Sequence, residues 1–336
     1  MKALVTGGGG FLGTAICEQL IKKGWQVSSF SRNAYPHLEK LGVSQFQGNL
    51  TDSASLKTAL SGKDIVFHVA AKTGIWGKRE EYLKTNFEGT ETIVSLCLEL
   101  GIRNLVYSST PSVIFNGKDM EGVDESVPYP EHFEAFYPET KAMAEKLVMS
   151  QDPAKLATVS LRPHLIWGPR DHNLVRRILE RGKKGMLKKI GDGSNKVDVT
   201  YIDDAAKAHV LAAEKLSESE DQRLLVAGKT YFISSGQPID LWEMVNRILA
   251  AGGLEPVKAR VSLSTARFAG LMLENIYKLF NIQSEPRMTR WLADELSSAH
   301  WFDISAAKKD LGYEPEVSID LGFERLSAWL SEEAVK

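Results

Sequence analysis

Apolar residues near the start of the chain follow two different spacings, and each spacing predicts a different secondary structure. Residues 2–6 form a short apolar run, which predicts a buried strand. Helical spacing then holds until Gly24, before a second strand pattern at 25–30, and its apolar positions are Phe11, Leu12, Ala15, Ile16, Leu20 and Ile21. The first thirty residues therefore predict a strand, a glycine turn, a helix and a second strand.

Strand and helix patterns continue to alternate as far as residue 169. One clear helix pattern covers 85–101. Four further strands are predicted at 43–50, 64–71, 104–110 and 159–169. This alternation predicts an α/β protein with a doubly wound parallel sheet, the Rossmann fold, whose ligands bind at the carboxyl ends of the strands.

The pattern beyond the first six strands predicts a smaller C-terminal substrate-binding domain. A helix is expected at 173–182, and an alanine-rich segment at 197–216 is expected to return to the sheet. We therefore assign residues 1–164, with 197–216, to the nucleotide-binding domain. Residues 165–196 and 217–336 are assigned to the substrate-binding domain.

One segment of the C-terminal half, residues 262–282, carries a long apolar stripe at helical spacing. Arg267, Glu274 and Lys278 interrupt the segment, so we do not expect it to cross a membrane. Two interpretations stay open: a helix packed on the core, or a surface that binds acyl chains or a partner. The stripe consists of Phe268, Leu271, Met272, Ile276, Leu279 and Phe280.

Three glycines separate the first strand from the first helix, and their spacing predicts a dinucleotide site. Gly7, Gly10 and Gly13 let the backbone turn sharply, approach a pyrophosphate closely and pack the helix on the strand. The start of the helix, at Phe11 and Leu12, offers backbone N–H groups and a positive dipole end to the phosphates.

The end of the second predicted strand indicates which dinucleotide binds. An NAD site usually offers a carboxylate here to hold the ribose 2′-hydroxyl, but this chain has Ser31 and Arg32. Arg32 can pair with a 2′-phosphate and Ser31 can donate to it. We therefore expect NADP(H); the alternative is that Arg32 is only a solvated loop cation.

A tyrosine and a lysine four residues apart, Tyr137 and Lys141, form the candidate catalytic pair. Pro138 indicates that a helix begins at Tyr137, so Lys141 lies one turn further on the same side. A lysine ammonium and an oxidised nicotinamide would both lower the phenol pKa. Thr110 or Ser109, at the end of the fifth strand, would hold the substrate oxygen while Tyr137 handles the proton.

Composition and charge narrow the class of protein without identifying it. A net charge of -2 gives no reason to expect a nucleic-acid or anionic-membrane partner. Cys17 and Cys97 are expected to be buried thiols in a reducing compartment, and His68 and His164 lack partners at metal-ligand spacing. The two histidines therefore give no reason to expect a metal. Because the N-terminus lacks the apolar region of a signal peptide, we expect a cytoplasmic protein.

Five segments together resemble the extended short-chain dehydrogenase/reductase family. They are "TGGGGFLG", "HVAA", "YSSTPSV", "YPETK" and "LRPHLIWGP". The resemblance implies that Thr110 is the catalytic Ser/Thr, Tyr137 the acid/base, and Lys141 its partner, which also holds the nicotinamide ribose. It places Pro163 beside the nicotinamide carboxamide and Asn86 near the site, although Asn86 could equally cap or pack a helix.

The resemblance also implies cofactor contacts at the ends of the third and fourth strands. The expected residues are Asn49, Leu50, Ala70 and Ala71. Asn49 stands where family members often carry an aspartate toward the adenine. An amide can still form a hydrogen bond there, so only this contact is in question.

Within that family, "YSSTPSVIFNG" resembles the 3β-hydroxysteroid dehydrogenase branch, and further segments resemble its bacterial 2-alkyl-3-oxoalkanoate reductases. This resemblance implies NADPH-dependent reduction of long-chain β-keto acids in olefin biosynthesis, with a small apolar acyl-type substrate and a possible homodimer or assembly with other pathway enzymes. The alternatives are a hydroxysteroid or sterol dehydrogenase, perhaps with isomerase activity, a nucleotide-sugar epimerase, and a non-catalytic NADP(H) sensor.

Overall fold

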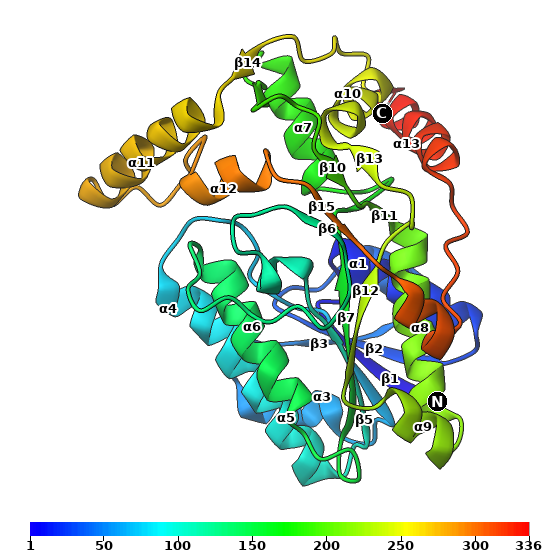
Figure 1. Ribbon diagram of the computed structural model, residues 1–336. Coiled ribbons are helices and arrows are strands. Elements are labelled where there is room, and N and C mark those ends of the chain that lie inside the picture. Colours follow the sequence, from blue (N-terminus) through cyan, green and yellow to red (C-terminus); the bar gives the residue numbers. More distant parts are fainter. Residues whose placement is uncertain (336) are drawn as a thin grey trace.

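A seven-stranded parallel sheet lies at the centre of the computed structural model, which describes residues 1–335 (Figure 1). The strand order is β12-β7-β5-β4-β1-β2-β3. Their bounds are β1 Lys2–Thr6, β2 Gln26–Ser31, β3 Ser44–Gln47, β4 Ile65–His68, β5 Asn104–Ser108, β7 Ala157–Pro163 and β12 Lys229–Ile233. The order runs outward in both directions from β1 and β4, so a crevice forms at the carboxyl ends between them. The predicted fold class is confirmed.

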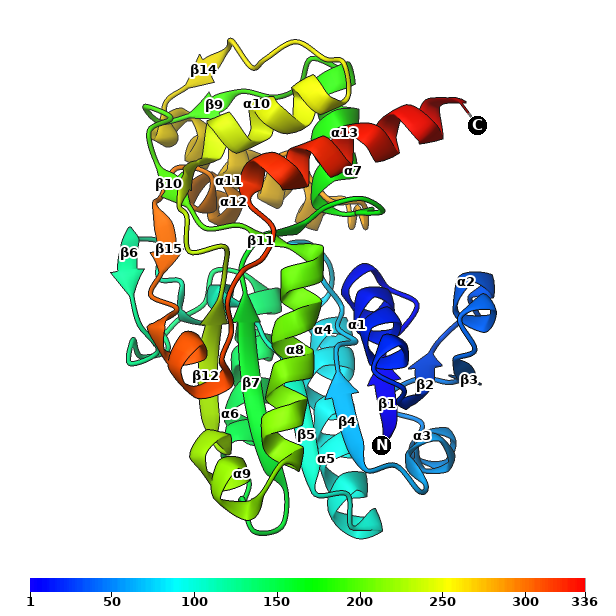
Figure 2. The same ribbon diagram turned by 90° about the vertical axis from the view of Figure 1, so that its right-hand side faces the viewer.

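Helices cover both faces of this sheet, as Figure 2 shows. One face packs against α1 (Phe11–Lys22) and α8 (Ile202–Ser217), and the other against α3 (Ser53–Leu60), α5 (Gly89–Leu100) and α6 (Phe136–Met149). Successive strand residues point to opposite faces, so Ala3 and Val5 join one core and Leu4 joins the other. Burial on both faces explains why the strands appear as continuous apolar runs in the sequence.

One strand of the large sheet was not expected from the sequence. β12 pairs in parallel with β7 along the edge of the sheet, although it lies in residues 217–336, which we assigned to the substrate-binding domain. The chain reaches it through α8 and then α9 (Glu220–Val226). The alanine-rich helix at 197–216 therefore belongs to a long crossover between two neighbouring strands, which a local pattern does not indicate.

The C-terminal half adds a four-stranded sheet, two short strand pairs and further helices above the carboxyl edge of the large sheet (Figure 1). The four-stranded sheet contains β13 Ile239–Asp240, β10 Lys196–Val197, β15 His300–Phe302 and β6 Met120–Val123. The strand pairs are β8 Ile166–Trp167 with β11 Thr200–Tyr201, and β9 Lys189–Ile190 with β14 Arg260–Val261. The helices of this half are α7 Leu174–Lys183, α10 Leu241–Ala251, α11 Leu263–Leu279, α12 Arg290–Glu295 and α13 Ile319–Val335.

Short helical segments complete the described residues. They are α2 Pro36–Lys40, α4 Arg79–Tyr82, the π-helix η1 Leu83–Glu88, the 3₁₀ helix η2 Pro111–Ile114 and the π-helix η3 Ala307–Leu311. Across residues 1–335, none of the helices combines the length and apolar character that a membrane crossing requires.

The apolar stripe of residues 262–282 lies on α11 and faces away from the protein. Phe268, Leu279 and Phe280 are 65%, 79% and 69% exposed. The buried side of the helix is made by small residues such as Gly270, where a Cβ atom would come within 2.6 Å of the Thr289 backbone. Of the two interpretations that the sequence left open, packing of the stripe on the core is therefore excluded.

Candidate active site

The turn after β1 is too tight for any side chain at two of its glycines. Gly7 has a φ of +69°, and a Cβ atom there would lie 3.0 Å from the Ala70 Cα atom. A Cβ atom on Gly13 would lie 2.2 Å from the Gly7 carbonyl oxygen. The turn is closed by a hydrogen bond from the Gly10 N–H to the same oxygen, at 2.9 Å. As a result, the N-terminus of α1 opens directly onto the carboxyl edge of the sheet, where it can receive phosphate groups.

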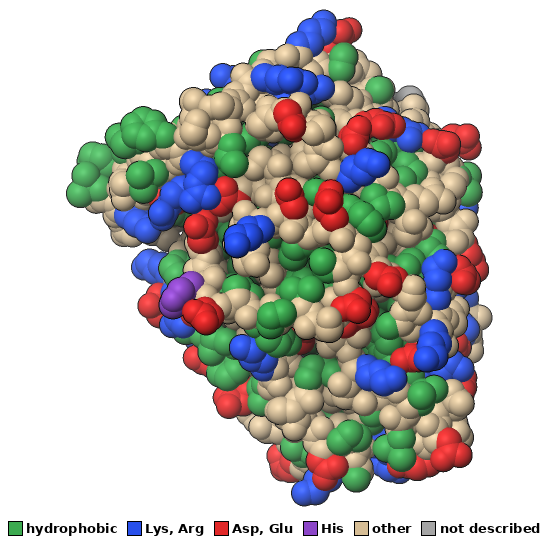
Figure 3. All heavy atoms as spheres, in the orientation of Figure 1, with side chains coloured by type: hydrophobic (Ala, Val, Ile, Leu, Met, Phe, Trp, Pro, Cys, Tyr) green, Lys and Arg blue, Asp and Glu red, His purple; other side chains and the backbone are tan. Residues whose placement is uncertain are grey.

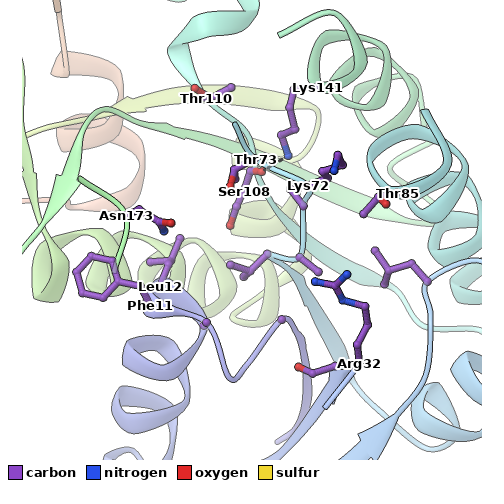
Figure 4. Close-up of a pocket in the computed structure, with 18 of the residues that line it drawn as sticks. Phe11, Leu12, Arg32, Lys72, Thr73, Thr85, Ser108, Thr110, Lys141 and Asn173 are labelled. Carbon is purple, nitrogen blue, oxygen red and sulfur yellow. Dashed lines mark hydrogen bonds between the residues drawn. The ribbon is translucent and has the colours of Figure 1, made fainter. Parts of the chain in front are cut away.

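A cavity of about 890 Å³ lies at this edge and brings together every site residue predicted from the sequence. Figure 4 shows how α1, β2, β5 and α6 each contribute to its wall. The predicted residues that line it are Gly7, Gly10, Phe11, Leu12, Gly13, Ser31, Arg32, Asn49, Leu50, Ala70, Ala71, Thr110, Tyr137, Lys141 and Pro163. Residues that are distant in the sequence thus form one continuous wall, although their individual roles stay predictions.

Arg32 marks one end of the cavity. Its side chain is exposed and reaches from the end of β2 toward the cavity (Figure 4). Within residues 1–335 no ion pair is recorded for Arg32, so its guanidinium is available to an anionic ligand. The Tyr35 ring, which sequence reasoning missed, lies so close to Gly9 that a Cβ atom there would be 2.1 Å from it. No sequence signal indicated this contact, because it depends on the path of the loop after β2.

Tyr137 and Lys141 line the opposite part of the cavity, in the first two turns of α6. Lys141 is buried; its Nζ atom donates to the Ser108 carbonyl oxygen at 2.6 Å and lies 4.1 Å from the centre of the Tyr107 ring. Burial lowers the pKa of Lys141 to about 7, and the charge of Glu145 opposes this shift. The strand end and α6 are thus joined directly behind the predicted catalytic tyrosine.

The pKa of Tyr137 differs from the sequence-based expectation. Burial raises the pKa of Tyr137 to about 12, and the hydrogen bond with Thr110 only partly opposes this rise. Lys141 does not produce the expected lowering, because its Nζ atom is directed to the Ser108 carbonyl. Tyr137 is therefore a neutral hydroxyl near pH 7, ready to donate its proton.

Thr110 is the better placed of the two candidate hydroxyl groups. It precedes η2, where its side chain accepts a hydrogen bond from the Ser112 N–H at 3.3 Å, and it is also hydrogen-bonded to Tyr137. Ser109 also lines the cavity, but it is nine-tenths buried and its hydroxyl lies toward Glu145. Thr110 and Tyr137 together can hold one oxygen atom of a ligand.

Asn86 positions the loop that follows β4. Its side chain accepts from the Lys72 N–H at 2.7 Å and donates to the Lys72 carbonyl and to the Thr140 hydroxyl, each at 3.1 Å. It is 2% exposed and lies in the π-helix η1. Of the roles considered for Asn86, the structure supports packing: it fastens the cavity loop to α6.

A buried ion pair beneath Lys141 was not predicted. Glu145, one turn further along α6, binds Arg162 of β7 at 2.5 Å and also accepts from the hydroxyls of Tyr129 and Ser160. Burial raises the Glu145 pKa, but the hydrogen bonds and charge of Arg162 outweigh burial and lower it overall. The spacing of Lys141 and Glu145 was a signal that could have indicated this carboxylate, since residues four apart share a helix face.

The two histidines that lacked metal partners in the sequence are held in hydrogen-bonded pairs. His68 lies between the hydroxyls of Thr6 and Thr90, at 2.8 and 2.9 Å, and burial lowers its pKa to about 3. His164 contacts His300 at 2.7 Å. Both histidines are buried, and the hydrogen bonds of their ring nitrogens link the ends of β4 and β7 to neighbouring segments.

The substrate side of the cavity differs from the expectation in one respect. Beyond Tyr137 the cavity is lined by the loop at Lys72 and Thr73 and by Leu165 and Ile166. The sequence left open that the 262–282 helix offers a surface for acyl chains, but none of its described residues lines this cavity. Its stripe instead faces away, because the buried side of α11 is used to pack on the chain around Thr289.

The low pKa of Lys141 predicts a pH-dependent gain of stability when its charge is removed. Its pKa lies near 7 in the fold and near 10.5 in the unfolded chain, so the cost of burying the charge is full below pH 7 and fades as the pH rises toward 10.5. At 1.36 kcal/mol per pKa unit, this cost is at most about 5 kcal/mol. Lys141→Met should therefore raise Tm at pH 6.5 more than at pH 9.5, while turnover is lost.

Thermal unfolding of the wild type and Lys141→Met at the two pH values measures this difference. Lys155→Met, at an exposed lysine, is the matched control and should leave Tm nearly unchanged. A variant that is equally destabilised at both pH values would show that the bond to Ser108 outweighs the burial of charge.

The chain is similar to known proteins over nearly its whole length. The model of the 3-beta hydroxysteroid dehydrogenase/isomerase family matches residues 4–264. The chain is 48% identical to a 2-alkyl-3-oxoalkanoate reductase of Shewanella oneidensis, covering 98% of this chain and 86% of that protein. It is 47% identical to one of Stenotrophomonas maltophilia, covering 98% and 99%. The sterol-4-alpha-carboxylate 3-dehydrogenase, decarboxylating, of Mus musculus is 34% identical, covering 96% and 89%.

Solved structures give the same fold at lower identity. The crystal structure of gox2253 superposes with a TM-score of 0.78 at 26% identity, covering 98% of both chains. A UDP-glucuronic acid 4-epimerase from Bacillus cereus, in complex with NAD, superposes with a TM-score of 0.76 at 22% identity, covering 99% of both. The second likeness shows the fold alone.

Proposed function

The chain belongs to the 3-beta hydroxysteroid dehydrogenase/isomerase family, and we propose that it is an NADPH-dependent reductase of long-chain 2-alkyl-3-oxoalkanoic acids. Membership of this family makes it an oxidoreductase. The products would be 2-alkyl-3-hydroxyalkanoic acids, formed in long-chain olefin biosynthesis. The observation that carries the proposal is the single cavity that joins the glycine turn and Arg32 to Thr110 and Tyr137.

The residues of the cavity fit a nicotinamide dinucleotide. Gly7 and Gly13 leave no room for a side chain, so a pyrophosphate can lie against the backbone at the start of α1. Lys141 and Pro163 line the end where the nicotinamide would lie, and Arg32 lies at the other end. When bound there in its reduced form, the cofactor supplies the hydride for the keto carbon.

The chain's own residues would supply the proton and the orientation. Thr110 and Tyr137 would each donate a hydrogen bond to the keto oxygen, and the Tyr137 hydroxyl would pass its proton to that oxygen as negative charge develops. A pKa raised to about 12 keeps Tyr137 protonated at neutral pH, which is the form that ketone reduction needs.

The substrate is tested most easily in the reverse direction, because β-keto acids decarboxylate readily. We expect purified protein to form NADPH from NADP⁺ and a 2-alkyl-3-hydroxyalkanoic acid. Longer alkyl chains should lower KM, since each buried CH₂ adds up to ~0.8 kcal/mol. Shorter-chain acids of the same head group are the control. Equal KM values across chain lengths would argue against a site for long apolar substrates.

A sterol dehydrogenase is the second candidate, favoured by a relative at 34% identity that carries such a name. The two reductase relatives, at 48% and 47%, are more similar over the same length. A substrate panel separates the two functions. Oxidation of a 3β-hydroxysterol, with no turnover of the long-chain hydroxy acid, would assign the chain to the second candidate.

The choice between NADPH and NADH depends on Arg32. Arg32→Asp should weaken NADPH binding by roughly 10- to 100-fold, because a charge-assisted bond to a phosphate is worth about 1.5–3 kcal/mol. NADH binding should be unchanged or stronger. Fluorescence titration of both cofactors measures the two affinities, and Lys155→Asp controls for the change of total charge. A wild type that binds NADH more tightly would contradict the assignment.

A further inference from the structure

Exposed apolar side chains of the described residues are concentrated on one helix. Seven of the thirteen large apolar residues that are exposed belong to residues 263–280, on α11 and the residue after it. The helix projects from the rest of the protein in Figure 1, and Figure 3 shows apolar side chains gathered along this arm with Lys and Arg side chains beside them. The seven are Leu263, Phe268, Leu271, Met272, Ile276, Leu279 and Phe280. Six of them, all except Leu263 in the first turn, form what we call the outer face of α11.

The outer face is wide and carries no charge. At about 100° per residue, the side chains from Leu271 through Phe268 to Phe280 cover about half of the helix circumference. The other residues in this half are small or uncharged, namely Ser264, Thr265, Ala269 and Asn275. Such a face is far wider than the narrow seam by which two helices pair, and it is typical of a helix that lies in a membrane interface.

Two cations lie along one border of the outer face. Arg267 and Lys278 are eleven residues apart, which puts them within about 20° of one line along the helix. Arg267 contacts Glu134 and Asp294, whereas for Lys278 no ion pair is recorded within residues 1–335. In an antiparallel pair of two such helices, the same border of each would meet, so cations would lie beside cations. Anionic lipid headgroups would instead attract Lys278, which is not neutralised by a carboxylate of the described residues.

The inner side of the same helix contacts a loop whose first residues line the cavity. Tyr277 packs its ring edge-on against Trp76, with ring centres 5.8 Å apart, and the Trp76 Nε1–H donates to the Ile282 carbonyl at 3.0 Å. Trp76 belongs to the loop after β4, which lines the cavity at Lys72 and Thr73. The helix that carries the outer face is therefore joined to the loop that forms part of the cavity wall.

We propose that the outer face of α11 docks on an anionic phospholipid bilayer, with Phe268, Leu279 and Phe280 inserted below the headgroups. The net charge of the whole chain, -2, gave no reason to expect such a partner, because a total does not show where two cations lie relative to an uncharged apolar face. This inference goes beyond the proposed function and does not depend on the identity of the substrate.

Flotation with lipid vesicles, without substrate or cofactor, tests the docking directly. The wild type should bind vesicles of phosphatidylcholine with phosphatidylglycerol. Its affinity for vesicles of phosphatidylcholine alone should be lower, on the order of 10-fold. Leu279→Ser with Phe280→Ser should lower binding to the mixed vesicles by at least ~10-fold, since it removes the two most exposed apolar side chains. Lys278→Glu should weaken binding to the mixed vesicles only.

The matched control also removes two exposed apolar side chains, both leucines, but on a distant helix (Figure 1). Leu224→Ser with Leu225→Ser, on α9, changes side chains that are 52% and 45% exposed and should bind vesicles like the wild type. Near-ultraviolet circular dichroism and oxidation of a short-chain soluble hydroxy acid check that each variant is folded. Phe268→Ser gives a second test on the outer face if the double variant fails to fold.

Three results would overturn the proposal. The first is a wild type that does not float with anionic vesicles. The second is a Leu279→Ser, Phe280→Ser variant that floats as well as the wild type. The third is a dimer in light scattering that these substitutions convert to a monomer, which would assign the face to a second copy of the chain. Since vesicle binding is measured without turnover, failure of the proposed function would leave these outcomes unchanged.

Discussion

Tyr137→Phe is expected to lower kcat by about 10²–10⁴-fold while leaving cofactor affinity close to that of the wild type. The substitution removes only the hydroxyl that is hydrogen-bonded to Thr110. It keeps the aromatic ring of residue 137 in the first turn of α6. Without that hydroxyl, none of the described residues is in position to pass a proton to the keto oxygen. Thr110 cannot replace Tyr137, because Thr110 is not followed by an acidic group that could resupply its proton.

Single-turnover kinetics and cofactor titration together measure this result. Tyr35→Phe is the matched control, because it removes a phenol hydroxyl from the same cavity at its Gly9 end and should change kcat little. A Tyr137→Phe variant that reduces substrate at nearly the wild-type rate would place the proton donor elsewhere. Loss of cofactor binding in the variant would instead indicate that the hydroxyl supports the cavity wall.

The features that could be predicted from the sequence are those encoded in contiguous segments. A buried strand followed by Gly7, Gly10 and Gly13 has few alternative conformations, so the turn and the start of α1 follow from local rules. Thr110 follows the end of β5 by two residues and Tyr137 is the second residue of α6, and parallel strands present their carboxyl ends at one edge. Local patterns therefore placed the glycine turn, Thr110 and Tyr137 together without any knowledge of long-range contacts. The other cofactor contacts, at Asn49, Leu50, Ala70, Ala71 and Pro163, were implied by the family resemblance.

The features that could not be predicted depend on contacts between distant segments. β12 joins the sheet only because α8 and α9 carry the chain back across it. The stripe of α11 was recognised, but which side of that helix packs is decided by the fit of Gly270 against Thr289. The Tyr137 pKa was expected to fall, and it rises because burial, which no motif reports, exceeds the effect of the hydrogen bond with Thr110.

The Glu145–Arg162 pair yields the prediction with the largest expected effect on stability. Glu145→Ala is expected to lower the free energy of unfolding by about 3–5 kcal/mol, because it leaves the charge of Arg162 buried without a partner. Arg162 is 3% exposed and Glu145 is fully buried. The variant also removes the acceptor of the Tyr129 and Ser160 hydroxyls, and the negative charge that supports a protonated Lys141. Urea unfolding at pH 7.5 measures the loss.

A double variant separates the cost of an unpaired charge from the value of the pair itself. Glu145→Leu with Arg162→Met replaces both ions by apolar side chains. The free energy needed to desolvate a buried ion pair is often as large as the attraction between its charges. We therefore expect the double variant to be more stable than Glu145→Ala by at least about 2 kcal/mol. Its Lys141, however, loses the carboxylate of Glu145 that raises its pKa, so turnover should fall although the fold is retained. A double variant as unstable as Glu145→Ala would show instead that the hydrogen bonds of Tyr129 and Ser160, rather than the charge of Arg162, fasten α6 to β7 behind the catalytic residues.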